Sequence, residues 1–223
     1  VRVGGVRARL EGLLRGWEGA PPRRRRGAAP ARGYAHEADQ SKQVHVVVVH
    51  DAPAEPHPDA VHEKVVASVL SGGMAGRLFS EVREKRGLCY AVSAGYRGDR
   101  DFGAVSAYVG TTPERAQQSL DVLAQELARI NDPARGAVTR EEFERAMTGM
   151  KSRLVFSGES TAARAATVAS DVFRLGRARS LTELRAEYDR VTLESVNAYA
   201  AGRRLGVTTI QTVGPAALIP PAL

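Results

Sequence analysis

The sequence predicts an α+β fold, with helices packed on one face of a mostly antiparallel sheet. Two runs of alternating apolar residues, 88–96 and 105–109, are joined by a glycine-containing turn and predict an antiparallel hairpin. From residue 116 onward, apolar residues recur every three or four positions, which predicts a series of helices. Strands that pair locally and helices that cluster along the chain are typical of the α+β class.

One strand and two helices are predicted ahead of the hairpin. The β-branched run 44–50 predicts a strand. Asp59 is expected to cap a helix with valines along one side, and the sequence Ser-Gly-Gly at 71–73 ends it. Apolar residues within 74–82 line one side of a second, short helix, which Gly87 ends.

After the hairpin, the chain is predicted to be mostly helical. Apolar spacings of four and three residues predict a helix over 116–130. Thr139 and Ser180 are each followed three residues later by glutamate, the pattern of a capping box that opens a helix. Thr192 is expected to cap a further helix, and the run 207–213 predicts a last strand.

Composition divides the chain into four segments. Residues 1–20 have helical spacing and look like the end of a preceding domain. Residues 21–41 are rich in Pro, Gly, Arg and Ala and are interpreted as a linker. The dense pattern of apolar residues over 42–215 predicts one folded domain, and 216–223 is a proline-rich tail.

Several protein classes are excluded by composition. A chain with 43% hydrophobic residues is too apolar to be disordered. Its one cysteine, Cys89, rules out an internal disulfide and a thiolate metal cluster, and we expect a buried thiol. The longest apolar run, 46–49, is far too short for a membrane span, and no secretory signal pattern opens the sequence. We therefore expect a soluble protein and leave cytoplasm and periplasm open.

The excess of basic residues raises the alternative of nucleic-acid binding. The chain has 32 Lys and Arg against 25 Asp and Glu, and four of the arginines form the block 23–26. This block lies between Pro22 and Pro30 without an interleaved aromatic residue, which favours a solvated linker. Nucleic acid is therefore not the expected partner, and salt-sensitive binding that needs residues 21–30 would be its signature.

The histidine spacing does not predict a metal site. A helical zinc motif needs two histidines four residues apart with a glutamate between them. The five histidines, at positions 36, 45, 50, 57 and 62, include no such pair. His45 and His50 are also expected on opposite faces of one strand because an odd number of residues separates them.

One segment carries a family resemblance. Residues 71–92 read SGGMAGRLFSEVREKRGLCYAV, in which glycines and a short helix lead through a tight turn into a strand. This segment resembles the C-terminal half of the pitrilysin/insulinase-type zinc peptidases, the inverzincins, and most closely their bacterial, processing-peptidase-like members. The resemblance continues through Asp101-Phe-Gly, through 110–114 and through 191–196. It covers about 42–215.

This resemblance implies an architecture and two site residues. Family members enclose a peptide chamber between two homologous α+β halves, and the N-terminal half binds zinc through an H-x-x-E-H motif. The C-terminal half contributes an arginine and a tyrosine seven residues apart, which here fall on Arg83 and Tyr90. Residues 1–20 would then be a remnant of the N-terminal half, and 21–41 the tether. The implied partners are a zinc-bearing half or subunit, in a hetero- or homodimer, and a peptide substrate.

The chemistry of the pair suits this role. Peptide hydrolysis passes through a tetrahedral intermediate with developing negative charge, which a tyrosine hydroxyl and a guanidinium can both stabilise as donors. No zinc ligand set is expected in this chain, so we expect it to be inactive alone. Two alternatives stay open: Arg83 and Tyr90 belong to a non-catalytic scaffold of the same family, or they are an ordinary surface arginine and a core-facing tyrosine.

Overall fold

The computed structural model describes residues 3–18 and 31–221. Two compact units result, one within residues 1–31 and one within 32–223. The first contains helix α1 (Val3–Leu13), which agrees with the helical spacing of this segment. The arginine block 23–26 lies outside the described residues.

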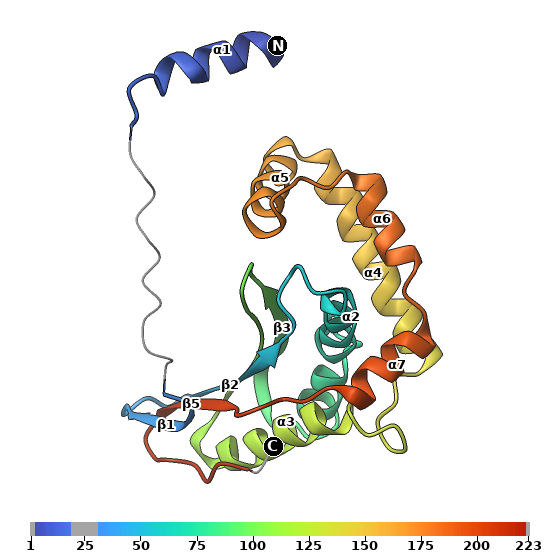
Figure 1. Ribbon diagram of the computed structural model, residues 1–223. Helices are drawn as coiled ribbons and strands as arrows, with labels where there is room; N and C mark the ends of the chain where they lie inside the picture. The colour runs from blue at the N-terminus through green and yellow to red at the C-terminus, as the bar shows by residue number, and fades with distance from the viewer. Residues whose placement is uncertain (1–2, 19–30, 222–223) are drawn as a thin grey trace. The chain divides into compact units, whose positions relative to one another are not determined.

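The second unit contains one five-stranded sheet and its helices (Figure 1). The strands are β1 (Gly33–Ala38), β2 (Val44–Ala52), β3 (Cys89–Gly98), β4 (Gly103–Thr111) and β5 (Thr209–Gly214). The helices are α2 (Ala60–Ser71), η1 (Phe79–Glu84), η2 (Pro113–Arg115), α3 (Ala116–Arg129), α4 (Arg140–Glu159), α5 (Thr161–Leu175), α6 (Leu181–Asp189) and α7 (Leu193–Gly202).

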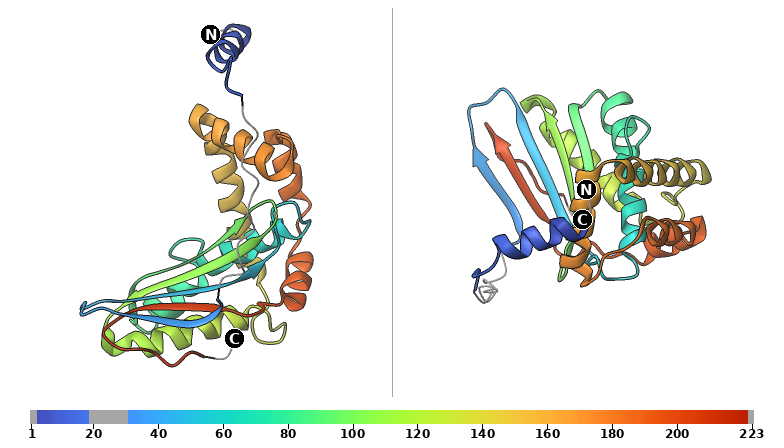
Figure 2. Two further views of the ribbon diagram at one scale, coloured as in Figure 1. Left: turned by 60° about the vertical axis from the view of Figure 1, so that its left-hand side comes forward. Right: turned by 90° about the horizontal axis from the view of Figure 1, so that it is seen from above.

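The sheet is mostly antiparallel, as the sequence predicts. Its strand order is β1-β5-β2-β4-β3, so β5 lies between β1 and β2 and β3 forms one edge. The pairs β2–β4, β2–β5 and β3–β4 are antiparallel, and β1–β5 is parallel. Helices α2 and α3 lie on the same face of the sheet (Figures 1 and 2). The predicted α+β class is confirmed.

Alternation along the strands places the core on the helix-covered face. In β2, Val44, Val46 and Val48 are buried, whereas the residues between them are only half-buried and face the other side. This periodicity of two follows from the pleat of a strand. Against these valines pack the apolar sides of α2 and α3. His50 is buried on this face and His45 lies on the other, as their spacing predicts.

A buried ionic network joins α2 to the segment after α7. The Glu63 carboxylate in α2 accepts hydrogen bonds from Arg203 Nε (2.9 Å) and Nη2 (2.7 Å), and both side chains are at most 2% exposed. The Tyr199 hydroxyl donates to the same carboxylate. Arg203 also contacts Asn131 Oδ1 at 3.1 Å and His50 Nε2 at 2.9 Å. Each nitrogen of this buried guanidinium group therefore has at least one partner.

The second half of α4 extends past the sheet and carries α5 and α6 (Figure 2). The first half packs against α2 through Ala146, Met147 and Met150. Beyond Met150, helices α4, α5 and α6 together bury only Asp171 and Leu184. No helix of the described residues combines the length and hydropathy needed to cross a bilayer.

Helix starts agree with the capping predictions at three of four places. Capping boxes open α4 at Thr139, α6 at Ser180 and α7 at Thr192. Asp59 occupies the N-cap position of α2, but its side chain makes no capping hydrogen bond. Its carboxylate instead lies 3.2 Å from Nδ1 of His62, a residue in the first turn of α2, so that expectation was wrong.

Three other expectations differ from the structure. Residues 33–38, interpreted as part of the linker, form β1, because Tyr34 and His36 both reach Thr212 of β5 and supply a long-range pairing. The short helix before Gly87 is a π-helix over its last turns. Cys89 is half-buried rather than buried because it opens the edge strand β3.

Candidate functional site

The segment 76–90 folds into a corner that joins η1 to the edge strand β3. Gly87 has φ +60°, a conformation that L side chains rarely adopt, and it reverses the chain after η1. The Leu88 N–H donates to the Val82 carbonyl at 3.0 Å, and both of these side chains are buried. The end of the helix and the start of the strand are therefore held together by the backbone and by the core.

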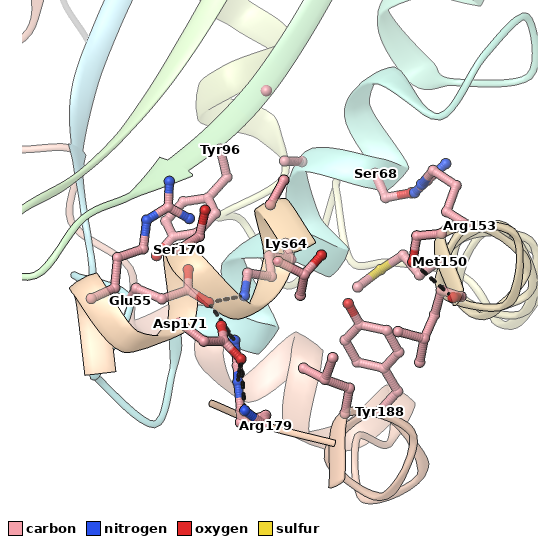
Figure 3. A pocket seen from close by; sticks show the side chains of 18 of the residues that line it. Glu55, Lys64, Ser68, Tyr96, Met150, Arg153, Ser170, Asp171, Arg179 and Tyr188 are labelled. Atoms are coloured by element: carbon pink, nitrogen blue, oxygen red, sulfur yellow. Dashed lines mark hydrogen bonds and ion pairs between the residues drawn. The ribbon is translucent and has the colours of Figure 1, made fainter. Parts of the chain in front are cut away.

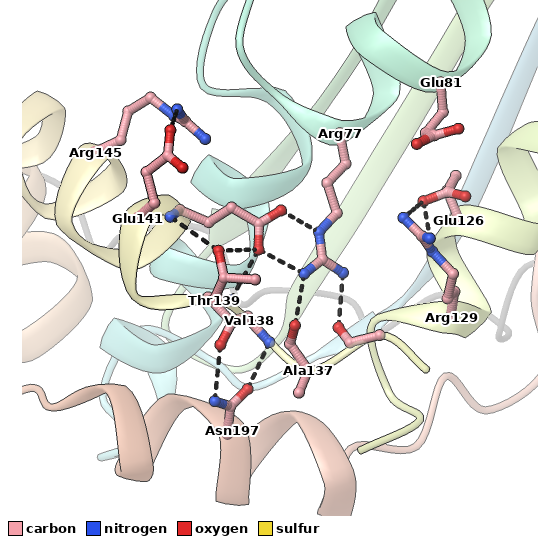
Figure 4. Close-up of polar contacts among 12 residues, drawn as sticks. Arg77, Glu81, Glu126, Arg129, Ala137, Val138, Thr139, Glu141, Arg145 and Asn197 are labelled. Atoms are coloured by element: carbon pink, nitrogen blue, oxygen red, sulfur yellow. Dashed lines mark hydrogen bonds and ion pairs between the residues drawn. The ribbon is translucent and has the colours of Figure 1, made fainter. Parts of the chain in front are cut away.

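Arg77 links the N-terminal end of this corner to α4 (Figure 4). Its guanidinium, 7% exposed, donates to both carboxylate oxygens of Glu142 at 2.6 and 2.7 Å and to the carbonyls of Gly136 and Ala137. Burial alone would raise the pKa of Glu142, but the hydrogen bonds from Arg77 and Thr139 lower it below its ordinary value. The same glutamate completes the capping box of α4, so one carboxylate fixes both elements.

Arg83 lies on the exposed side of η1. Its guanidinium carbon is 5.0 Å from the centroid of the Phe79 ring, a cation–π geometry. Burial raises the pKa of the Cys89 thiol, and the positive charge of Arg83 offsets part of that effect. Within 31–221, no carboxylate lies within ion-pair distance of Arg83. Its charge is therefore available to a ligand.

Tyr90 lies on β3 and faces the side of the sheet opposite the helices. The side chain is 42% exposed, and its hydroxyl donates to Gln43 Oε1 at 3.0 Å. Its ring covers Gly110 of β4, where an added Cβ would lie 2.8 Å from the ring. Desolvation, and then the neighbouring Tyr108, raise the pKa of Tyr90 above its ordinary value. Tyr90 is therefore a protonated donor at neutral pH, and it is not a core residue.

Two further residues extend this polar patch along the sheet. The Tyr108 hydroxyl lies 2.9 Å from His45 Nδ1, and the two rings stack with centroids 6.0 Å apart. Both side chains lie on the same face as Tyr90. The patch thus contains two tyrosine hydroxyls, an imidazole and the Gln43 amide.

The structure places both sequence-predicted site residues at one corner, exposed on the adjoining η1 and β3. Sequence reasoning missed Gln43, Tyr108 and the anchor Arg77. The alternation of β4 could have placed Tyr108 on this face, but the contact between Arg77 and Glu142 has no local sequence signal. In residues 3–18 and 31–221, no three His, Cys, Asp or Glu side chains gather as a metal site would require, so the zinc that the resemblance implies does not fit this chain's own residues.

Comparisons with known proteins identify the family of this chain. Residues 6–150 match the family model described as the peptidase M16 inactive domain. The chain is 34% identical over 136 residues to the uncharacterized zinc protease YmxG of Bacillus subtilis, covering 61% of this chain and 32% of that protein. It is 32% identical over 162 residues to an uncharacterized zinc protease of Mycobacterium tuberculosis, covering 71% of this chain and 36% of that protein. The chain therefore spans about a third of the length of these curated relatives.

Solved structures show the same fold. A peptidase M16 inactive domain from Pseudomonas fluorescens superimposes with a TM-score of 0.65 at 23% identity, over 86% of this chain and 46% of that one. A protease from Helicobacter pylori superimposes with a TM-score of 0.74 at 16% identity, over 96% of this chain and 53% of that one. Because the family model matches well over half of the residues, this chain belongs to the family of peptidase M16 inactive domains.

Proposed function

We propose that this chain is the zinc-less C-terminal half of a metalloendopeptidase and completes the peptide chamber of a zinc-bearing N-terminal half. The observation that carries the proposal is the corner at 83–90, where Arg83 and Tyr90 are both exposed, both are donors, and neither is neutralised by a carboxylate. The family match supports the partner, because an inactive domain needs an active one to hydrolyse peptides.

The role of each residue follows from its chemistry. The zinc of the partner half would supply the activated water. Tyr90 would donate its hydroxyl proton to the oxygen that becomes negative at the scissile carbonyl, and its raised pKa keeps that proton in place. Arg83 would add a positive charge on the same side. Gln43 orients the Tyr90 hydroxyl by accepting its hydrogen bond at 3.0 Å until substrate takes its place.

We also propose that residues 1–20 are a remnant of the N-terminal half, although the match to the inactive-domain model begins at residue 6 and so includes most of α1. The apolar side chains of α1 recur at helical spacing and are exposed: Val3, Val6, Leu10 and Leu13. Such a stripe is typical of a helix that packs on a core. In this proposal, the zinc-bearing half covers this stripe, whether it is in the same polypeptide or in a separate subunit.

Peptide hydrolysis by the recombined halves tests the proposal. The chain is mixed with a zinc-bearing N-terminal half, and hydrolysis of a quenched fluorescent peptide is followed for wild type, Tyr90→Phe and Arg83→Ala. Loss of a transition-state donor lowers kcat by about a hundredfold. The matched control is Arg135→Ala, a surface arginine with an 83% exposed side chain that is remote from the corner in sequence.

The outcome distinguishes a catalytic role of this chain from a purely structural scaffold role. A fall in kcat for both variants, with unchanged assembly of the halves by size-exclusion chromatography, supports the catalytic role. Full activity in both variants contradicts it and leaves the chain as a scaffold subunit, which is the alternative function. Nucleic-acid binding would require residues 21–30, and no retention on DNA at low salt removes that option.

A further inference from the structure

A second concave site lies between the helical extension and the edge of the sheet (Figure 3). This pocket has a volume of about 720 Å³, within the range of ligand sites in proteins. Its walls come from α2, β3, α4, α5 and α6, so it is formed only where the extension folds back beside β3. It is separate from the corner at 83–90, because neither Arg83 nor Tyr90 lines it.

The charged side chains of the pocket leave a positive excess. Both of its acidic residues are already paired. Glu55 contacts Lys64 at 2.5 Å and Arg179 at 3.4 Å, and Asp171 contacts Arg179 at 2.8 Å. Figure 3 shows these four side chains together on one side of the pocket. This cluster fixes the position of α5 and α6 and contributes little net charge to a ligand.

Two further arginines line the pocket without a carboxylate partner. Arg153 comes from α4, and Arg174 comes from the end of α5. Among the described residues, neither forms an ion pair or a side-chain hydrogen bond. The two arginines therefore belong to different walls of the pocket. A ligand with separated negative charges fits this arrangement better than a single small anion.

The rest of the lining suits a peptide. Hydroxyl groups of Ser68, Thr167 and Ser170 offer donors and acceptors for backbone amides. Met150 and Leu154 provide an apolar wall that an inorganic anion would not use. Charge alone therefore does not define the site.

We propose that this pocket binds an acidic segment of a peptide, with its carboxylates paired to Arg153 and Arg174. The inference rests on the proposed function in one respect, that a peptide is the molecule delivered to this half. It extends that function by naming the substrate class: peptides with acidic residues outside the bond to be cleaved. Arg153 and Arg174 are binding residues and take no part in the reaction.

Peptide binding to the chain alone tests this proposal without any zinc-bearing half. Fluorescence anisotropy is measured with a labelled peptide that contains glutamates and with the same peptide carrying glutamines instead. Two partly exposed ion pairs should favour the acidic peptide by roughly tenfold at low salt, and screening should remove this preference at high salt. The variant Arg153→Ala/Arg174→Ala should lose the preference.

The controls separate this site from other surfaces and from the corner. Arg164→Ala removes an exposed arginine of α5 that does not line the pocket, and it should bind the acidic peptide like wild type. Tyr90→Phe should also bind like wild type, even where it abolishes hydrolysis in the recombined enzyme. If the proposed catalytic role of Arg83 and Tyr90 is wrong, the peptide-binding test of this pocket is therefore still valid.

Three results would overturn the proposal. The first is equal affinity for the glutamate and glutamine peptides. The second is a charge preference that the double variant retains while its circular dichroism and thermal unfolding match those of wild type. The third is binding of inorganic phosphate, with the same dependence on Arg153 and Arg174, by a chain that does not bind the acidic peptide.

Discussion

Replacing Arg203 by methionine should strongly destabilise the second unit. Methionine keeps most of the buried stem but removes the guanidinium group, whose Nε and Nη2 hold Glu63 at 2.9 and 2.7 Å. Glu63 is fully buried, so water cannot replace the lost donors, and only the Tyr199 hydroxyl remains. Breaking a buried ion pair on one side costs about 3–5 kcal/mol.

Protonation of the unpaired carboxylate sets an independent upper limit on the loss of folding free energy in Arg203→Met. A buried carboxylate without a partner can take up a proton, and at pH 7 this costs about 3.7 kcal/mol for a glutamate of ordinary pKa. At pH 5 the same step costs about 1 kcal/mol. The free energy of unfolding of Arg203→Met, measured by urea denaturation, should therefore approach that of wild type as the pH falls from 7 to 5.

The double variant Glu63→Leu/Arg203→Met provides the matched control. Removing both partners of a buried pair leaves no unpaired charge, so the double variant should be more stable than Arg203→Met alone. The reasoning is refuted if Arg203→Met loses less than about 1 kcal/mol, if its loss is independent of pH, or if the double variant is the less stable of the two.

Two further predictions concern pH and the corner. Burial and the neighbouring Arg203 lower the pKa of His50, so the unfolded chain takes up a proton at a higher pH than the folded chain does. The free energy of unfolding should therefore fall as the pH drops below about 6.5. His50→Gln should weaken this pH dependence, and the exposed control His57→Gln should leave it unchanged. Gly110→Ala places a Cβ 2.8 Å from the Tyr90 ring and should lower kcat of the recombined enzyme by up to about a hundredfold. Gly202→Ala, at the end of α7 and with open space at its Cβ, should leave kcat unchanged. Equal activity of the two glycine variants, or identical pH curves for the two histidine variants, would contradict these predictions.

Local patterns predicted most elements of this fold because each signal acts over a few residues. The valine alternation of β2 and the capping boxes at Thr139, Ser180 and Thr192 are such signals, and the structure contains all of them. Strand β1 carries no comparable signal. Its sequence, GYAHEA, has no apolar run, and it is a strand only because β5, about 175 residues later, pairs with it.

The candidate site likewise contains residues that could be identified from the sequence and contacts that could not. Arg83 and Tyr90 were identified from the resemblance, and the structure exposes both, but their roles stay a proposal. The contacts that position them are long-range. Gln43 reaches Tyr90 across 47 residues, and Arg77 reaches Glu142 across 65. Pairs of that separation depend on the complete tertiary packing, which single-sequence periodicity does not contain.

The position of β5 in the sheet has a consequence for synthesis of the chain. Because β5 lies between β1 and β2, the edges of both strands stay unpaired until residues 209–214 have left the ribosome. The hairpin of β3 and β4 can form early, but closure of the sheet must wait for nearly the whole unit. Until then the chain exposes β-branched edges that favour intermolecular pairing. Truncation before β5 should therefore yield aggregated rather than partly folded protein, and chaperone binding should persist until this strand is translated.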